Sequence, residues 1–161
     1  MNQAIKTTLL PANKKIAFVQ ACWHSDIVEQ ARIAFSNKII ELTDVKDADI
    51  DIFKVPGSLE IPLQCQRLAR SGNYHIIVAA GLIVDGGIYR HEFVAATVLD
   101  AMMDIQLKTD VPILSVVLTP QHFDENSAES VDYFYQHFSV KGEEAGQACY
   151  QVLKNSSLSM V

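Results

Sequence analysis

Four short apolar runs alternate along this chain with longer segments of helical periodicity, and that alternation constrains the fold more than any other feature. The runs cover residues 16–21, 50–55, 75–80 and 113–118, and each has the length of a buried strand. Strands that alternate with helices of about ten residues or more form parallel βαβ units with right-handed crossovers. The pattern therefore predicts a four-stranded parallel sheet with helices on both faces.

The segments between the strands predict the helices. Helices are expected from Ser25 or Asp26 to Leu42, from about Leu59 to Ser71, along the stripe from Val94 to Ile105, from Ser127 to about Phe138, and from near Gly142 onward. The buried stripe of the last helix comprises Ala145, Cys149, Val152 and Leu153. Residues 50–55 largely alternate apolar and polar side chains, as a strand near a sheet edge does. The expected class is α/β, doubly wound and flavodoxin-like.

The composition is that of an ordinary folded domain. The 161 residues are 49% hydrophobic and 20% charged, so a single domain over residues 1–161 can bury a sizeable core without a disulfide or a metal. Residues 1–14 are expected to form a flexible or partner-contacting arm. No apolar stretch approaches the ~20 residues that a membrane helix needs. The first residues lack the apolar core of a signal peptide, so we expect a cytoplasmic protein without a membrane partner.

Charge and cysteine spacing argue against two further classes. The net charge is -6, and the four arginines (Arg32, Arg67, Arg70 and Arg90) are scattered, whereas nucleic acid binding requires a concentrated basic surface. Cys22, Cys65 and Cys149 follow neither metal nor redox spacing. We expect three reduced thiols, with the last two as small core residues.

The segment from Gly81 to Glu92 indicates function most strongly. It begins where an apolar run stops and ends where a helical pattern starts, and open α/β sheets bind ligands at such positions. Gly86 and Gly87 allow backbone amides to approach an anion, and the dipole of the following helix favours negative charge there. Arg90 and His91 add a cation and a titratable imidazole. The alternative is that the glycines form only a tight turn and that both side chains are solvated.

Polar and aromatic residues also follow the first two strands. Trp23 stands after the first strand, where its ring could stack on a planar heterocycle or lie half-buried against the neighbouring helix. After the turn at Pro56-Gly57, Ser58 and Glu60 occupy a helix amino terminus. They can bind a polyol or a heterocycle, or they can simply cap the helix. Because the carboxyl ends of parallel strands meet at one edge, we expect these residues to share a site.

Together these segments resemble the lumazine synthase family. Residues 55–62, Val-Pro-Gly-Ser-Leu-Glu-Ile-Pro, are similar to its motif Val-Pro-Gly-(Ala/Ser)-x-Glu-(Ile/Leu)-Pro, and residues 81–94 are similar to its phosphate loop and following helix. The resemblance extends from Ile16 to the carboxyl-terminal helix and includes Lys141-Gly142. Trp23 in place of the usual phenylalanine, together with the sequence of the glycine loop, is closest to the type II branch.

The resemblance implies a reaction and an assembly. The reaction is the condensation of 5-amino-6-ribitylaminouracil with 3,4-dihydroxy-2-butanone 4-phosphate to 6,7-dimethyl-8-ribityllumazine, the penultimate step of riboflavin biosynthesis. It implies two small-molecule substrates, no cofactor and no metal. It also implies a homo-oligomer, a pentamer or a dimer of pentamers, with active sites between subunits.

By position, the resemblance assigns roles to individual residues. Trp23 stacks on the pyrimidine of the substrate. The polar edges of this pyrimidine and its ribityl chain are bound by the turn that contains Gly57, Ser58, Leu59 and Glu60. Ile83 and Val84 form an apolar wall, and the phosphate is bound by the amides of Gly86, Gly87 and Ile88. Ser115 and Lys141 contribute to the substrate site, and Lys141 reaches a pocket shared with the adjacent subunit.

The chain departs from the family pattern at the acid–base position. Aligning Glu92-Phe93-Val94 with the family places Arg90 where the usual histidine lies, and the family's phosphate-binding arginine before Lys141 is absent. We expect both residues of the pair Arg90-His91 to be catalytic, with Arg90 binding phosphate and His91 transferring protons. Adjacent helical residues point about 100° apart, so the two side chains cannot face one point without bending.

Other functions remain open from the sequence. The missing arginine gives some weight to a non-catalytic flavin or lumazine carrier. A flavodoxin-type electron carrier would need several Ser, Thr and Gly residues in the loop after the first strand, and residues 21–24 lack them. The stretch from Gln121 to His137 is longer than in capsid-forming members, which supports a decamer. His122 and His137 are either additional cations near the pocket or surface loop residues.

Overall fold

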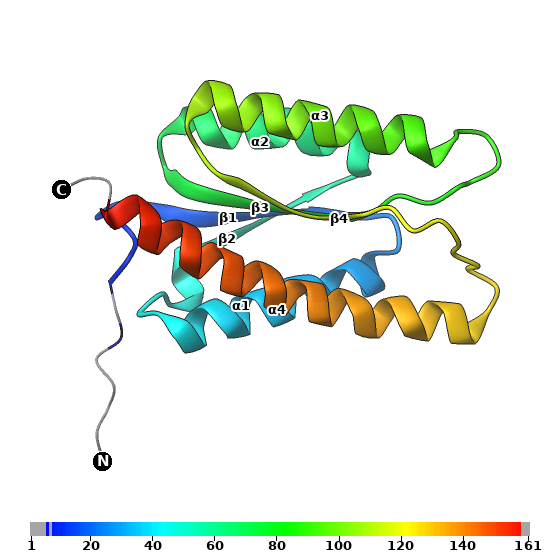
Figure 1. Ribbon diagram of the computed structural model, residues 1–161, viewed down its shortest axis with the longest axis horizontal. Helices are drawn as coiled ribbons and strands as arrows, with labels where there is room; N and C mark the ends of the chain where they lie inside the picture. The colour runs from blue at the N-terminus through cyan, green and yellow to red at the C-terminus, as the bar shows by residue number, and fades with distance from the viewer. Residues whose placement is uncertain (1–5, 7, 159–161) are drawn as a thin grey trace, which may run out of the picture.

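The computed structural model, which describes residue 6 and residues 8–158, contains a sheet of four parallel strands in the order β2-β1-β3-β4 (Figure 1). The strands are β1 (Lys15–Ala21), β2 (Ile50–Val55), β3 (Tyr74–Leu82) and β4 (Ile113–Leu118). Ile16 of β1 pairs with Ile50 of β2 on one side and with Ile76 of β3 on the other. The predicted flavodoxin-like class is confirmed, with β2 at an edge. Residues 1–5 and 7 of the expected arm lie outside the described residues.

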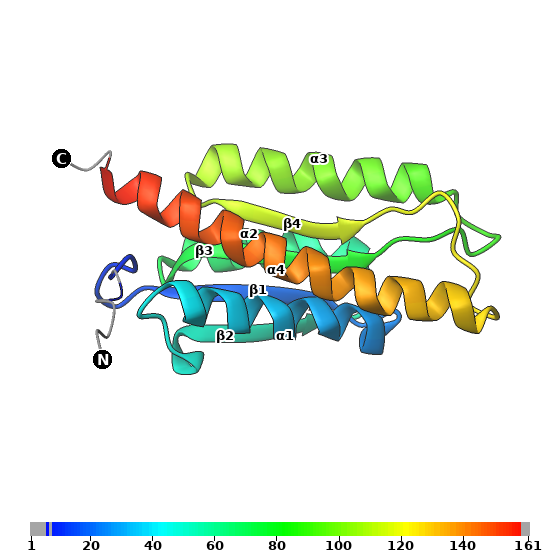
Figure 2. The same ribbon diagram turned by 60° about the horizontal axis from the view of Figure 1, so that its bottom comes forward.

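The helices form a layer on each face of the sheet (Figures 1 and 2). On one face lie α1 (Ser25–Leu42) and α4 (Ala128–Leu158), and on the other lie α2 (Ile61–Ser71) and α3 (His91–Thr109). The short 3-10 helices η1 (Asp47–Asp49) and η2 (Ser58–Glu60) precede β2 and α2. The loops that follow the strands therefore gather at one end of the molecule.

The sheet separates two apolar layers, because side chains along each strand alternate between its faces. Phe18, Phe35 and Phe138 are fully buried in the layer beneath α1 and α4. Cys149 belongs to that layer and Cys65 to the opposite one, as predicted. Burial raises the pKa of both thiols to about 12, so they remain protonated core residues.

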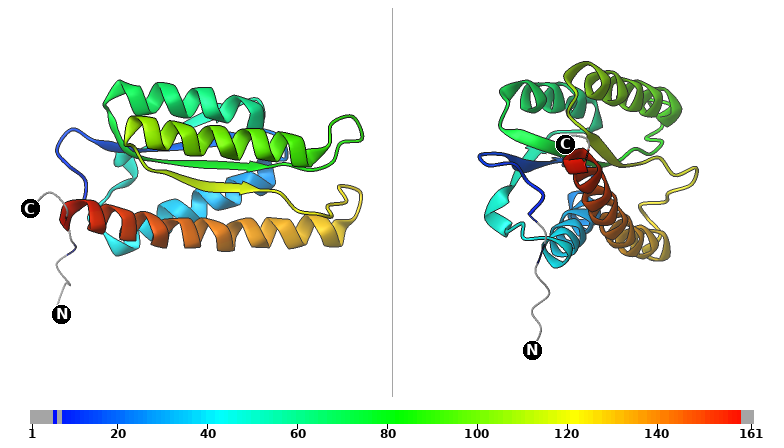
Figure 3. Two further views of the ribbon diagram at one scale, coloured as in Figure 1. Left: turned by 45° about the horizontal axis from the view of Figure 1, so that its top comes forward. Right: turned by 60° about the vertical axis from the view of Figure 1, so that its left-hand side comes forward.

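One prediction of helix boundaries is wrong: α4 is a single helix of 31 residues, where the sequence predicted one helix over 127–138 and another from near Gly142 (Figure 3). Gly142 lies inside α4 and faces α1. A Cβ atom at this position would lie 2.3 Å from the carbonyl oxygen of Ala31. The glycine is thus required for close packing of the two helices, and it does not mark the start of a helix.

One helix start agrees with the prediction, and one strand end differs from it. α1 begins at Ser25, but its N-cap is His24, whose backbone is left-handed with φ of 50° and whose side chain makes no capping bond. α1 thus spans Ser25–Leu42, as predicted, and Asp26 lies in its first turn. β3 continues two residues past its predicted end, because Gly81 and Leu82 still pair with β4.

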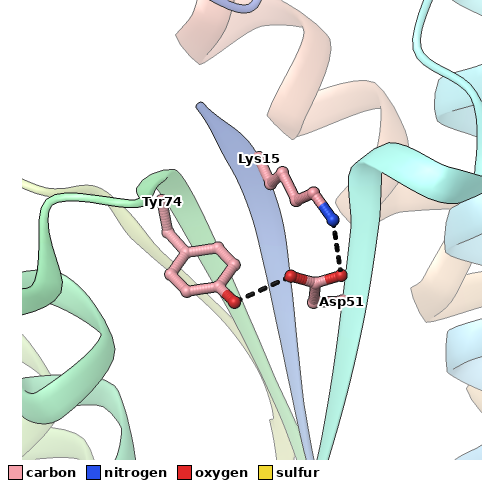
Figure 4. A network of polar contacts seen from close by, with 3 residues as sticks. All are labelled: Lys15, Asp51 and Tyr74. Atoms are coloured by element: carbon pink, nitrogen blue, oxygen red, sulfur yellow. Dashed lines mark hydrogen bonds and ion pairs between the residues drawn. The ribbon is translucent and has the colours of Figure 1, made fainter. Parts of the chain in front are cut away.

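A polar network ties together three strands at the opposite, amino-terminal end of the sheet (Figure 4). The ammonium of Lys15 lies 3.1 Å from one carboxylate oxygen of Asp51, and the hydroxyl of Tyr74 donates a 2.8 Å hydrogen bond to the other. The ring of Tyr74 also packs edge-on against Phe53. Burial and the Asp51 carboxylate raise the pKa of Tyr74 to about 12.

Candidate active site at the carboxyl ends of the strands

A pocket of about 310 Å³, here called the Trp23 pocket, opens where β1, β2 and β3 end. Of the residues expected to bind substrate, phosphate or protons, its wall contains Trp23, Gly57, Ser58, Leu59, Glu60, Ile83, Val84, Gly86, Ile88 and His91. These residues come from the loop after β1, the turn between β2 and α2, and the loop between β3 and α3. The three loops lie side by side because parallel strands end at one edge of the sheet.

Trp23 presents its indole to the pocket and is 67% exposed, so it is not half-buried against a helix. The backbone N–H of Cys22 still bonds to the carbonyl of Val55, which keeps the end of β1 attached to β2. Trp23, the residue after Cys22, lies beyond the end of β1. An exposed, rigid aromatic ring beside a pocket is suited to stacking on a planar ligand.

The turn after β2 is built tightly against this indole. Glu60 accepts a 2.9 Å hydrogen bond from the backbone N–H of Gly57, so it does act as a cap for η2. A Cβ atom at Gly57 would lie 3.3 Å from the Glu60 carboxylate and 3.7 Å from the Trp23 ring. A Cβ at Gly81 would lie 2.7 Å from the hydroxyl oxygen of Ser58. Both glycines therefore allow polar side chains and the indole to converge on the pocket.

The loop between β3 and α3 supplies an apolar wall and an exposed glycine turn. Ile83 is buried and Val84 is half-buried, and both contribute to the wall. Gly87 has φ of 78°, a conformation that side chains other than glycine rarely adopt. Apart from the adjoining residues, no atom of the described chain lies within 4 Å of a Cβ placed at Gly86 or Gly87, so the loop is open to a ligand.

Of the adjacent pair Arg90-His91, only His91 lines the pocket. The guanidinium of Arg90, the N-cap of α3, lies over the ring of Phe93 at 5.8 Å from its centroid. His91 is the first residue of α3, and its side chain is only 13% exposed. The structure thus separates the two side chains, as the angle between adjacent helical residues requires.

Two carboxylates surround the imidazole of His91. Its Nδ1 lies 3.0 Å from Oδ2 of Asp85 and 3.5 Å from Oε2 of Glu92. The other oxygen of Asp85 accepts a 2.9 Å hydrogen bond from the backbone N–H of His91. That backbone bond, followed by the imidazole, lowers the pKa of Asp85. These three residues are close enough to hold a cation, but two of them are exposed carboxylates of a kind common on protein surfaces.

Besides Gly87 and Arg90, two more of the expected site residues, Ser115 and Lys141, do not line the pocket of their own chain. Ser115 is an exposed residue of β4 whose hydroxyl accepts a bond from the backbone N–H of Val117. Lys141 lies in α4, on the sheet face opposite to α2 and α3, and pairs with Glu144 at 2.7 Å. Within one chain, the structure does not bring either residue to the indole.

The sequence did not point to Tyr89, Val94 or Asp85, although the first two line the pocket and the third holds His91. Val94 lies one helical turn after His91, so helical spacing offered a signal for it, whereas Tyr89 precedes α3 and only adjoins the predicted Ile88 and Arg90. His122 lines a separate hollow of about 420 Å³ together with Phe123, and His137 stacks on Tyr133. Neither histidine lines the Trp23 pocket.

Comparisons with known proteins agree on one family. The sequence profile described as 6,7-dimethyl-8-ribityllumazine synthase matches residues 13–157. A protein of that name from Rhodococcus erythropolis is 56% identical over 142 residues, which cover 88% of this chain and 90% of the relative. A protein named 6,7-dimethyl-8-ribityllumazine synthase 2, from Bradyrhizobium diazoefficiens, is 53% identical over 146 residues, covering 87% of this chain and 82% of the relative.

Among the described helices, none combines the length and apolar character that crossing a bilayer requires.

Proposed function

The chain belongs to the 6,7-dimethyl-8-ribityllumazine synthase family, and we propose that the Trp23 pocket is where it performs the family's reaction. It is a transferase that condenses 5-amino-6-ribitylaminouracil with 3,4-dihydroxy-2-butanone 4-phosphate. The product is 6,7-dimethyl-8-ribityllumazine, formed in the penultimate step of riboflavin biosynthesis, and phosphate and water are released.

The main support for placing the reaction in this pocket is the exposed Trp23 indole, which lies beside an apolar wall and an open glycine turn. The reaction needs one slot that holds a flat ring and a phosphorylated fragment together, because a fixed orientation supplies much of the rate gain. It also needs a group that exchanges protons during imine formation, phosphate elimination and ring closure. His91 is the imidazole at this pocket.

We assign roles to the pocket residues on this basis. The pyrimidine stacks on Trp23 between the turn at Gly57 to Glu60 and the wall formed by Ile83 and Val84. Ser58 and Glu60 bind the polar edge of the ring and the ribityl hydroxyls, and Leu59 covers them. The amides of Gly86, Gly87 and Ile88 bind the phosphate beside the amino terminus of α3.

His91 transfers protons in this assignment, because its imidazole lines the pocket. Arg90 binds the phosphate from the rim of the pocket. Its side chain is exposed and lies over the ring of Phe93, so it can turn toward an anion in the glycine loop at small cost. An arginine suits this role because its planar fork of donors matches phosphate oxygens.

Ser115 and Lys141 act on the substrates bound by a neighbouring subunit, so the assembly is a homo-oligomer, a pentamer or a dimer of pentamers. Two features support this. Both side chains lie away from the pocket of their own chain, and the pocket rim carries exposed apolar residues, Ile88 at 87% and Tyr89 at 73%. Large exposed apolar patches mark interaction surfaces. Sedimentation at five or ten times the mass of one chain supports the proposal, and a monomer that is fully active contradicts it.

We place the reaction in the cytoplasm. The support is that Cys22, Cys65 and Cys149 are all free thiols, which is typical of a reducing compartment. Cell fractionation that recovered the protein outside the cytoplasm would contradict this assignment.

The function is tested by mixing the purified protein with both substrates and following absorbance. An enzyme generates the lumazine chromophore and free phosphate with turnover, and omission of either substrate abolishes both signals. A protein that binds lumazine but forms no chromophore from the substrates is a carrier, and that result would overturn the proposal.

A further inference from the structure

Asp85 makes two contacts with one residue, His91, through its two carboxylate oxygens. Oδ1 accepts the backbone N–H of His91 at 2.9 Å, and Oδ2 lies 3.0 Å from the imidazole Nδ1. The N-cap residue Arg90 offers no side-chain bond to the helix, so Asp85 supplies the cap from six residues before the start of α3. The same bond closes the glycine loop over the pocket.

The protonation of the imidazole follows from what surrounds Nδ1. This atom is buried from solvent, and its two ion-pair contacts within the described structure are the carboxylates of Asp85 and Glu92. An ionised carboxylate only accepts hydrogen bonds, so a buried nitrogen between two of them has to carry a proton. In the neutral imidazole, the lone pair is then on Nε2.

The contact between Nδ1 of His91 and Oδ2 of Asp85 is not aligned as a hydrogen bond. The distance between Nδ1 and Oδ2 is short, but the ring N–H does not yet point along a hydrogen bond. Catalytic hydrogen bonds are often poorly aligned in the absence of substrate and improve in the complex. A small rotation of the His91 ring is sufficient.

We propose that Asp85 is a positioning residue that keeps the proton of neutral His91 on Nδ1 and thereby makes Nε2 the base that takes a proton from substrate. This inference rests on the proposed function, because it deepens the role given to His91. When Nε2 accepts the proton, the imidazolium carries N–H at both nitrogens, and Asp85 stabilises it without being protonated. The proton on Nε2 is then returned to the departing group.

Three variants separate this role from capping. Asp85→Asn keeps an oxygen that can accept the backbone N–H, but its amide group donates toward Nδ1 and favours the opposite tautomer. Asp85→Ala removes both contacts. Asp104→Asn is the matched control, because Asp104 is an exposed residue of α3, the helix that carries His91, and its carboxylate pairs with Lys108 at 2.8 Å.

We expect Asp85→Asn to lower kcat and to leave KM nearly unchanged. Asp85→Asn should lower kcat about tenfold to a hundredfold while both KM values change less than about twofold, since acid–base catalysis contributes factors of about that size or more. Asp104→Asn should match the wild type. If Asp85→Asn keeps the wild-type kcat, Asp85 is only a helix cap and the proposal is overturned.

A second measurement does not depend on turnover. Nitrogen NMR of the protein labelled at its 5 histidines, with His91 assigned from His91→Gln, should show neutral His91 protonated at Nδ1, and protonated at Nε2 in Asp85→Asn. A wild-type signal from the Nε2–H tautomer contradicts the inference even if the enzyme is active. A protein without synthase activity contradicts the proposed function, while the tautomer result still decides the role of Asp85.

Discussion

At the scale of single residues, the pocket depends on a few close approaches. Gly57 lies between the Trp23 ring and the Glu60 carboxylate, and Gly81 leaves room for the hydroxyl of Ser58. A methyl group at either position would meet atoms at 3.3 Å or less. The glycines therefore determine how close the indole and the polar turn come to each other, and these distances set the width of the slot for a ring.

Replacing Trp23 tests the stacking role. Trp23→Ala should raise KM for the pyrimidine substrate by about twofold to tenfold, since aromatic stacking contributes roughly 0.5 to 1.5 kcal/mol beyond burial. Trp23→Phe should have a smaller effect. Steady-state kinetics check this, with Cys22→Ala as the control, because Cys22 is exposed next to Trp23 but does not line the pocket. An unchanged KM in Trp23→Ala would remove the stacking role.

The pair Arg90-His91 should divide its effects between two kinetic constants. Arg90→Ala should raise KM for the phosphorylated substrate at least about tenfold, because a hydrogen bond to a charged group contributes about 1.5 to 3 kcal/mol. His91→Ala should instead lower kcat. Initial rates with each substrate varied in turn measure both constants. Arg90→Ala with a wild-type KM contradicts the phosphate role, and His91→Ala with a wild-type kcat contradicts proton transfer.

At the scale of elements, the continuous helix α4 and its contact with α1 differ most from expectation. Gly142 faces the carbonyl of Ala31, and Gly146 faces the side chain of Lys38. The sequence around Gly142 carries the usual signal of a helix boundary, and only the position of α1 shows that the glycine has a packing role. By contrast, the strands were predictable to within two residues, because their apolar periodicity reports directly on burial.

Gly142→Ala should destabilise the protein by about 1 to 3 kcal/mol, because an added methyl group forces the backbones of α1 and α4 apart. In an exposed helix the same change would stabilise by roughly 1 kcal/mol. Gly146→Ala should also destabilise the protein, since the new methyl group would lie 2.7 Å from the Cβ of Lys38, an atom that is fixed to the backbone of α1. Urea unfolding followed by circular dichroism measures both. A Gly142→Ala variant as stable as the wild type would contradict the packing role.

At the scale of the whole molecule, the two ends of the sheet carry different features. The carboxyl end carries the Trp23 pocket, and the amino end carries the network of Lys15, Asp51 and Tyr74. The network ties β1, β2 and β3 together, and in it the phenol of Tyr74 donates a hydrogen bond to the carboxylate of Asp51. Its contribution to stability should depend on pH.

The folded-state pKa of Tyr74, about 12, lies above its usual value of 10.0. Its contribution to stability is therefore complete below about pH 10 and is lost as the pH rises toward 12. We expect a loss on the order of 1 kcal/mol, because solvent screens this half-exposed group. Thermal melts from pH 9 to 12 should show this slope, and Tyr74→Phe should reduce it. The exposed Tyr135→Phe is the control, and an equal slope in Tyr74→Phe contradicts the argument.

The carboxyl edge of the sheet was predictable as the location of the candidate site, because parallel strands bring their ends together whatever their sequence. Trp23, Glu60 and His91 all line one pocket for that reason. The contact of Asp85 with His91 was not predictable, since it spans six residues of a loop whose path depends on the left-handed Gly87. Lys141 could be placed on a helix, but the sequence did not show that it lies away from the Trp23 pocket of its own chain.

The most direct test of the account is a crystal structure of the assembled protein with a ribityl-substituted pyrimidine analogue and inorganic phosphate. The account predicts the ring against the Trp23 indole and the phosphate on the amides of Gly86 and Gly87, with Lys141 approaching from a second subunit. A ring bound elsewhere, with the indole in contact with protein only, would contradict it.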